Sequence, residues 1–139
     1  PALNVVVSQR LVRRICEKCR EPLEPDEGLE SRIKEFLAAL PQKTDKPEFE
    51  EIRLYRAIGC EECNNTGYKG RIGIFEIVGF DKAFASIINE KTTEIDIEKA
   101  ALERGFVGIQ ADGLIKVLRG VTTIEEVERQ TGPVDWKIV

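Results

Sequence analysis

The feature that most constrains this chain is its set of four cysteines, which fall in two Cys-x-x-Cys pairs, Cys16 with Cys19 and Cys60 with Cys63. Forty residues, from position 20 to position 59, separate the two pairs, and the chain contains no histidine. In such a knuckle both thiolates turn toward one centre, and two knuckles supply the four thiolates of a tetrahedral zinc site. The pattern therefore predicts one structural Zn²⁺ ion bound by all four cysteines. Because such a site has no open position for water, we do not expect it to be catalytic.

Three other uses of the cysteines stay open at this point. Two disulfides are possible, although a reducing cytosol disfavours them. A thioredoxin-like redox motif uses one pair after the first strand of a βαβ unit, which this sequence does not show. An iron–sulfur cluster also uses four cysteines, but usually at tighter spacings. Three basic residues lie near the cysteines in the sequence: Lys18, Lys69 and Arg71. They either partly compensate the negative charge of the thiolates or are ordinary solvated side chains.

The length, composition and net charge of the chain narrow the class of protein. A chain of 139 residues, 42% hydrophobic and 33% charged, is typical of one globular domain, or of one domain with a fragment of a neighbour. The net charge of −4 does not favour a nucleic-acid partner. We find neither an apolar run long enough to span a bilayer nor a signal peptide, so we expect a cytosolic chain. The chain begins with proline and contains no methionine, which indicates a piece of a longer protein.

No catalytic constellation is visible in the sequence. The lack of histidine excludes Ser-His-Asp and Cys-His catalysis. The phosphate-loop pattern Gly-x-x-x-x-Gly-Lys-Ser/Thr does not occur, and the glycine-bearing segment at residues 67–73 indicates only a tight turn. We therefore predict no catalytic and no cofactor-binding residues, and no enzyme activity for this chain by itself.

Apolar periodicity predicts an α+β fold that is mainly helical, with a short antiparallel strand pair and a four-cysteine zinc knuckle site. Leu11, Val12 and Ile15 fall at helical spacing, which predicts a short helix leading into the first cysteine pair. An apolar stripe over residues 29–40 predicts an amphipathic helix that Pro41 ends.

Two strands and two loops are predicted around that helix. Residues 52–58 and 71–78 have the composition of strands, and we expect them to pair antiparallel with the second cysteine pair at their tip. Residues 21–28 and 41–47, which contain prolines and charged residues, are expected to be loops.

Four helices are predicted in the last part of the chain. Asp81 and Thr93 are placed to cap two of them, and a third, at residues 110–119, is stopped by Gly120. Thr122 or Thr123 with the glutamates three residues on offers a capping box for the last helix, which is expected to end near residue 131. Residues 134–139 are expected to form a loosely held tail.

Residues 8–19, SQRLVRRICEKC, and residues 59–76, GCEECNNTGYKGRIGIFE, resemble the C-terminal tetracysteine domain of the type II secretion and type IV pilus assembly ATPases. Ser8 and Ile15 stand where that family usually has Ala and Leu. The family's closing pattern is matched by Asp112-Gly113, Lys116, Gly120, residues 122–127 and Arg129. The resemblance covers about residues 7–131, except for an insert at residues 22–52 that varies among members.

The resemblance implies a part of a larger motor. Residues 1–7 would be the final strand of an upstream ATPase core. Residues 8–80 would form the zinc-binding part with the insert at 22–52, residues 81–132 a helical part, and residues 133–139 a tail. The parent would be a cytoplasmic hexamer at the cytoplasmic face of the inner membrane. Its core would use ATP and Mg²⁺, and its partners would be the neighbouring subunits and an inner-membrane platform protein. This domain would have a structural and coupling role. The alternative is a zinc-ribbon module that binds nucleic acid or protein.

Overall fold

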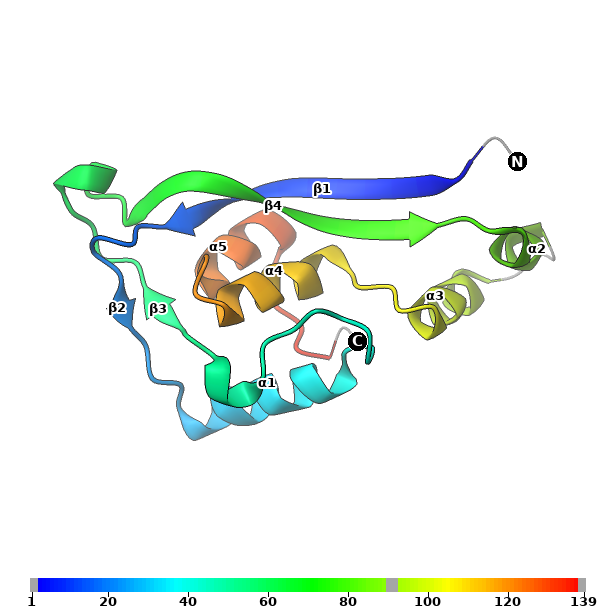
Figure 1. The fold of residues 1–139 in the computed structure, drawn as a ribbon, viewed down its shortest axis with the longest axis horizontal. Helices are drawn as coiled ribbons and strands as arrows, with labels where there is room; N and C mark the ends of the chain where they lie inside the picture. Colours follow the sequence, from blue (N-terminus) through cyan, green and yellow to red (C-terminus); the bar gives the residue numbers. More distant parts are fainter. Residues whose placement is uncertain (1–2, 90–92, 138–139) are drawn as a thin grey trace.

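The computed structural model describes residues 3–89 and 93–137 and has the predicted α+β architecture. Its elements are, in chain order, β1 (Val5–Ile15), β2 (Glu21–Pro22), α1 (Glu27–Ala39), η1 (Phe49–Glu51), β3 (Tyr55–Arg56), η2 (Glu61–Cys63), β4 (Tyr68–Gly79), α2 (Lys82–Asn89), α3 (Glu94–Glu103), α4 (Ile109–Leu118) and α5 (Ile124–Thr131). A long ribbon of β1 and β4 lies along one side of the molecule, α4 and α5 lie beside it, and α1 lies beyond them (Figure 1). The β2–β3 pair and α2–α3 lie at opposite ends of the ribbon.

The first segment is a strand, so the predicted helix at residues 11–15 is wrong. Leu11 is 48% exposed and Val12 is fully buried, which places them on opposite faces, as successive residues of a strand are. The valines at positions 5–7 and 12 are β-branched and favour an extended chain. The strand gains a ladder of hydrogen bonds with β4, which outweighs the local helical spacing.

The strand at residues 71–78 is confirmed within β4, but its predicted partner is wrong. β4 pairs antiparallel with β1, in a register that sets Val7 opposite Ile77 and Val12 opposite Ile72. Within residues 52–58 only β3 is a strand. It pairs with β2, which lies in the segment 21–28 that was predicted to be a loop. The physical reason is length, because β1 offers β4 eleven residues while β3 offers two.

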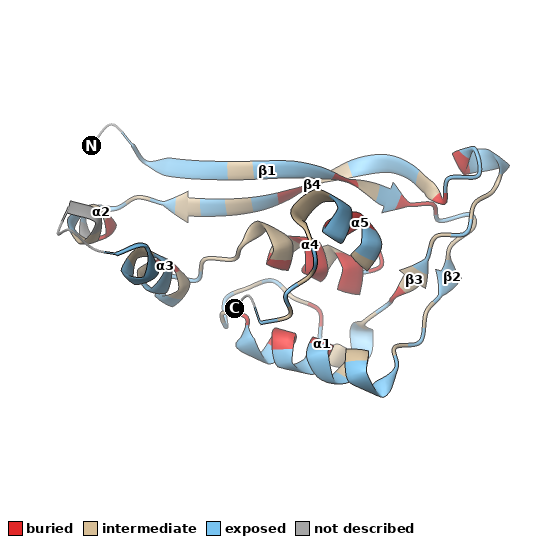
Figure 2. Cartoon of the chain, turned by 180° about the vertical axis from the view of Figure 1, so that it is seen from behind, coloured by how far each residue is buried: buried red, intermediate tan, exposed pale blue. Residues whose placement is uncertain are grey.

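The amphipathic helix is confirmed as α1. Asp26 caps it by accepting the backbone N–H of Leu29 at 2.7 Å, and the helix ends before Leu40 and Pro41. Its apolar stripe packs toward α4 and α5, and Figure 2 shows the buried residues gathered on the facing sides of these helices. The core consists of Ile33, Phe36, Leu37, Leu40, Leu54, Ala111, Leu114, Ile115, Val117, Leu118 and Val127.

The start of the C-terminal tail is held against this core rather than loosely attached. Trp136 meets Phe36 edge-on with ring centroids 6.0 Å apart, and Val134 packs against the same cluster. The backbone N–H of Asp135 donates to the Gln110 side chain at 2.9 Å. The expectation of a loose tail is therefore wrong for residues 134–137, while the last two residues lie outside the described part.

The positions at which the helices of the second half begin are confirmed, but one predicted capping box is not. Asp81 accepts the backbone N–H of Phe84 at 2.7 Å at the start of α2, and Thr93 caps α3. Thr123 caps α5, whereas the predicted capping box does not form because the Glu126 carboxylate turns to β1 instead. No helix in residues 3–89 or 93–137 is both long and apolar enough to cross a membrane.

Candidate metal centre

The structure brings all four cysteines together at one end of the β1–β4 ribbon. Their sulfurs all lie within 4.8 Å of one another, and the Cys16–Cys60, Cys19–Cys63 and Cys60–Cys63 pairs are 3.9, 3.8 and 3.8 Å apart. A tetrahedral site with Zn–S bonds of about 2.3 Å has sulfurs about 3.8 Å apart. A disulfide would require about 2.05 Å, and all four cysteines are free. The donor set therefore fits one tetrahedral metal ion with four sulfur ligands.

Each knuckle is a tight turn closed by its own backbone. In the first, which follows β1 directly, the N–H of Arg20 donates to the Cys16 carbonyl at 3.0 Å. In the second, Cys60 precedes η2 and Cys63 ends it, and the Asn65 N–H donates to the Cys60 carbonyl at 2.8 Å. The two turns are joined by the Cys16 N–H, which donates to the Gly67 carbonyl at 2.9 Å. Glycine is required at position 67, because its φ is +78° and a Cβ would lie 2.7 Å from the Ala57 Cβ.

Backbone N–H groups point at the sulfurs. Gly59 donates to Cys19 at 3.3 Å, while Cys60 and Gly67 each donate to the Cys63 sulfur at 3.2 Å. Burial by itself raises the pKa of the Cys63 thiol, but these two N–H groups and the neighbouring thiols bring that pKa down to about 6. Burial, together with hydrogen bonds to the other three thiols, raises the pKa of the Cys19 thiol to about 12, despite the N–H that Gly59 donates to it. The two N–H donors therefore favour the thiolate form of Cys63, which is the form that binds metals.

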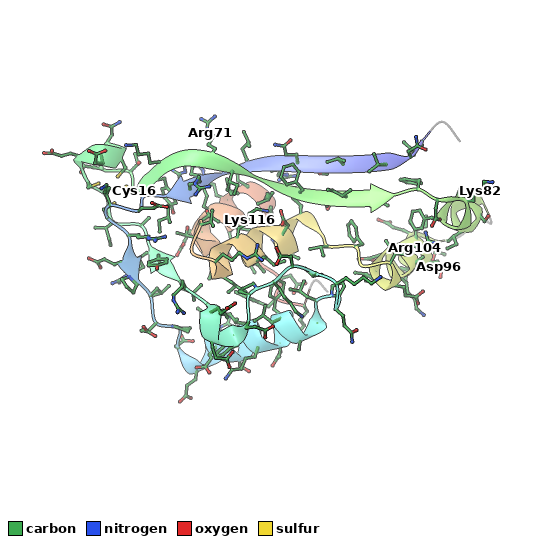
Figure 3. The ribbon with its side chains drawn as sticks, in the orientation of Figure 1. Cys16, Arg71, Lys82, Asp96, Arg104 and Lys116 are labelled. Carbon is green, nitrogen blue, oxygen red and sulfur yellow. The ribbon has the colours of Figure 1, made fainter. Side chains whose placement is uncertain are left out.

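The three nearby basic residues differ in their relation to the cluster. Lys69 forms an ion pair with Glu62 at 3.0 Å, and that pairing raises its pKa, with smaller contributions from Cys16 and Cys60. Lys18 lines a shallow cavity of about 250 Å³ together with Lys69 and Cys16. Arg71 projects from the outer side of the ribbon, away from Cys16 (Figure 3). Lys69 therefore interacts electrostatically with the cysteines.

Sequence reasoning missed a polar network that anchors the base of this site. Glu126 of α5 is 1% exposed and accepts hydrogen bonds from the Arg13 backbone N–H at 3.0 Å and from the Arg13 guanidinium at 2.6 and 3.0 Å. Burial raises the pKa of the Glu126 carboxyl, but the Arg13 hydrogen bonds outweigh burial and hold that pKa below its usual range. The two residues are 113 positions apart, so no local spacing could have indicated the pair.

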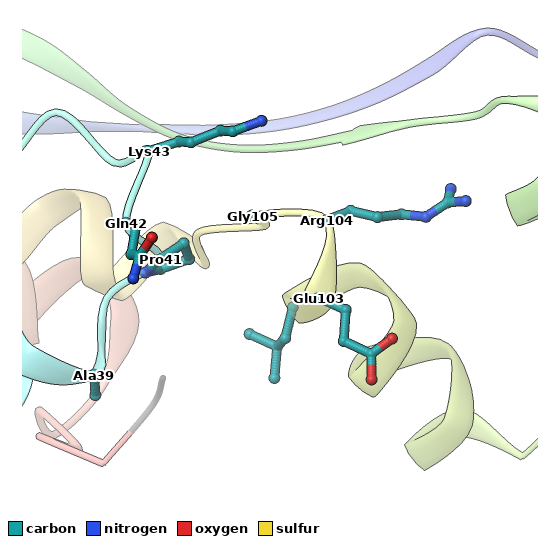
Figure 4. A pocket seen from close by; sticks show the side chains of 8 residues that line it. Ala39, Pro41, Gln42, Lys43, Glu103, Arg104 and Gly105 are labelled. Atoms are coloured by element: carbon teal, nitrogen blue, oxygen red, sulfur yellow. The ribbon is translucent and has the colours of Figure 1, made fainter.

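A cavity of about 490 Å³ lies away from the cysteines, between the end of α1 and the end of α3 (Figure 4). Lys43, Glu103 and Arg104 contribute its charged side chains. Arg104 is already engaged, since it pairs with Asp81 at 3.0 Å and lies over the Phe84 ring at 5.2 Å. The Arg104 side chain therefore already has partners within the protein, and we assign no ligand to this cavity.

Comparison with known proteins gives consistent results. The sequence model of the family described as Type II/IV secretion system protein matches residues 1–129. The type IV pilus assembly ATPase PilB of Thermus thermophilus is 38% identical over 130 residues, which cover 94% of this chain and 14% of that protein. The type II secretion system protein E of Pseudomonas aeruginosa and the type II secretion system ATPase E of Vibrio cholerae are each 41% identical over 126 residues, covering 91% of this chain and 23% of those proteins. The chain thus spans less than a quarter of the length of these relatives.

Proposed function

The chain belongs to the family of type II/IV secretion system proteins, and we propose that it is the C-terminal zinc-binding domain of a secretion or pilus-assembly ATPase. The observation that carries the zinc assignment is the four-sulfur cluster, whose sulfur–sulfur distances of 3.8–3.9 Å match the edge of a tetrahedral zinc–thiolate site. Cys16, Cys19, Cys60 and Cys63 would hold the ion. Since they fill the tetrahedron, the zinc would stabilise the fold and take no part in hydrolysis.

Hydrolysis of ATP would belong to an upstream core that binds ATP and Mg²⁺, and residues 1–7 would be the end of that core. The exposed apolar side chains at the start of β1 support this, because Val5, Val6 and Val7 are 49%, 46% and 53% exposed. Ile77, opposite Val7 on β4, is 55% exposed. Such a run of valines on both faces of a ribbon is typical of a strand that is covered on both sides.

The backbone of β1 supports the same proposal. The Asn4 carbonyl accepts a hydrogen bond from Phe80, whereas the N–H of Arg13 is turned away from β4 toward Glu126. In an antiparallel ladder alternate residues face the partner, so Val5, Val7, Gln9 and Leu11 direct their backbone groups to the same outer edge as Arg13. The α4–α5 segment covers this edge at Arg13, and the edge before it is suited to pairing with a strand of the core.

The assembled parent would be a hexamer at the cytoplasmic face of the inner membrane, where a platform protein would be its partner. In that setting the domain would have a structural and coupling role, since its ribbon would run from the ATPase core to the zinc site. The family match favours this role over a zinc-ribbon module that binds nucleic acid. The net charge of −4 points the same way.

Metal analysis of protein purified without added metal tests the zinc assignment. We expect about one zinc per chain, because four thiolates fill one tetrahedral site. A folded, zinc-free protein with two disulfides would overturn it.

A fusion tests the link to an ATPase. The chain alone should not hydrolyse ATP, whereas the Vibrio cholerae relative should keep its activity when this chain replaces its matching segment. A matched fusion with Cys60→Ser should lose assembly of the motor. A fusion that is well folded, zinc-loaded and inactive would count against the proposed role.

A further inference from the structure

Glu126 lies in the first turn of α5, yet its carboxylate serves the strand that leads to the first cysteine. One oxygen accepts the backbone N–H of Arg13, and the other accepts two guanidinium N–H groups of the same residue. Arg129 also approaches that second oxygen, at 3.6 Å. The carboxylate therefore fixes both the backbone and the side chain of a residue three positions before Cys16.

Neighbouring residues of the α4–α5 segment fix the same strand at two more points. The Thr122 hydroxyl donates to the Arg13 carbonyl at 2.8 Å, and the Ile15 N–H donates to the Val121 carbonyl at 2.9 Å. The strand end that leads into the first knuckle is thus held on its outer edge by consecutive hydrogen bonds. Without them this edge would be open, as it is earlier in β1.

The arm that leaves the second knuckle is held by the same segment. The Tyr68 hydroxyl lies 2.9 Å from the Thr123 hydroxyl, and the Arg13 guanidinium lies over the Tyr68 ring, 4.2 Å from its centroid. Arg13 is therefore in contact with both strands that run into the cluster. A single residue held by Glu126 therefore contacts both arms.

We infer that Glu126 is a positioning residue for the four-cysteine site, acting on the metal ligands through Arg13. This inference rests on the proposed zinc site. The connection is short: Cys16 donates its N–H to Gly67, and Gly67 donates its own N–H to the Cys63 sulfur. A shift of β1 at Arg13 therefore displaces one ligand and an N–H donor to another. By linkage, metal binding should in turn stabilise α5.

The use of Glu126 at this place is specific. A glutamate three residues after a helix cap ordinarily turns back to the N–H of the capping residue. Here the Thr123 hydroxyl accepts the Glu126 N–H at 3.3 Å, but the carboxylate does not return the bond. Its neighbour Glu125 is exposed and has the same charge, which makes it a matched control.

The test compares zinc release from Glu126→Gln, Glu125→Gln and Val127→Ala to a coloured chelator at neutral pH. Val127 is fully buried beside Glu126 in the helical core, so its truncation lowers stability without removing the network. We expect Glu126→Gln to release zinc about tenfold faster than wild type, which corresponds to the low end of the losses of metal affinity that follow changes around metal ligands. Glu125→Gln should match wild type. Release from Glu126→Gln no faster than from Val127→Ala would overturn the inference.

Tyr68→Phe keeps the test decisive if Glu126→Gln does not fold. It removes only the hydroxyl bonded to Thr123 and should speed release by a smaller factor, and release equal to wild type would then count against the inference. The cobalt-substituted site gives a second readout, because a displaced ligand changes its visible bands while lower global stability does not. A wild-type chain without zinc would overturn the proposed site itself, whereas a zinc-loaded wild type with unchanged variants would overturn only the role of Glu126.

Discussion

The cysteine end of the ribbon and the helical core of α1, α4 and α5 are ordered by different forces. Around the cysteines the side chains between the ligands, such as Glu17, Lys18 and Glu61, are exposed, and order comes from sulfurs and backbone hydrogen bonds. In the helical core, order comes from apolar side chains such as Phe36 and Leu114, which are fully buried. By our proposal the order of the first region therefore depends on a bound ion, whereas that of the second depends on exclusion of water. One molecule thus contains two parts that should fail under different treatments.

The largest expected effect is loss of a sulfur ligand. Cys60→Ser should release the zinc, because structural zinc contributes on the order of 10–16 kcal/mol in zinc-finger peptides and three thiolates hold it less well. Amides of residues 15–20 and 59–70 should then exchange with solvent freely, while those of α1 and α4 stay protected. Hydrogen exchange measures both regions at once. Glu61→Gln, an exposed change inside the same knuckle, is the control.

If chelation left the amides of residues 15–20 and 59–70 as protected as before, the metal would not order this region. The contrast between the two parts of the molecule would then disappear.

Truncation of a core side chain should destabilise the helical core and leave the zinc in place. Leu114→Ala should cost about 2–5 kcal/mol of unfolding free energy, because the side chain is fully buried against α1 and leaves a cavity. Urea unfolding measures this cost, and metal analysis should still give one zinc per chain. Ile95→Ala, at a position that is 74% exposed, should change stability by less than about 0.5 kcal/mol. Zinc loss in parallel with the Leu114→Ala destabilisation would show that the two regions are not separable.

Gly120 lies where the two regions meet. Its carbonyl accepts a hydrogen bond from Arg20, the residue after Cys19, at 3.0 Å. Its φ is +70°, and a Cβ would lie 2.5 Å from the Tyr55 ring. Gly120→Ala should therefore cost about 1–3 kcal/mol and affect both parts of the molecule. Gly79→Ala, where a Cβ would meet nothing within 4 Å, should be close to neutral in the same thermal-unfolding measurement.

The smallest expected effect is on the acid dependence of stability. Because the folded-state pKa of Glu126 is lowered, its contribution to stability is present above the unfolded-state pKa of about 4.3. This contribution is lost as pH falls through the lower folded-state pKa. Between pH 6 and pH 3 the unfolding free energy should therefore fall less steeply for Glu126→Gln than for wild type. Glu125→Gln keeps the buried carboxylate and should keep the wild-type slope. Acid release of zinc is common to both variants, so equal slopes would mean that Glu126 is not held by Arg13 in solution.

Local signals predicted much of the second half. Asp81, Thr93 and Thr123 each cap the helix expected of them, since a cap is formed within one turn and depends on neighbours three residues away. The amphipathic stripe of α1 was predicted for the same reason. The resemblance implied a strand at residues 1–7, but its continuation to Ile15 was missed. Leu11, Val12 and Ile15 fit a helical period as well as a strand, and only the presence of β4 decides between them.

The sequence by itself determined which side chains could form the metal site and where the helices begin, because both depend on short spacings along the chain. Tertiary structure alone decided that β4 pairs with β1. Both β1 and β3 could in principle pair with β4, and β1 forms the longer ladder of hydrogen bonds. Tertiary structure also decided that the Glu126 carboxylate leaves its own helix cap for Arg13. That choice depends on two groups 113 residues apart meeting where burial makes an unpaired carboxylate costly, and no spacing in the sequence records such a meeting.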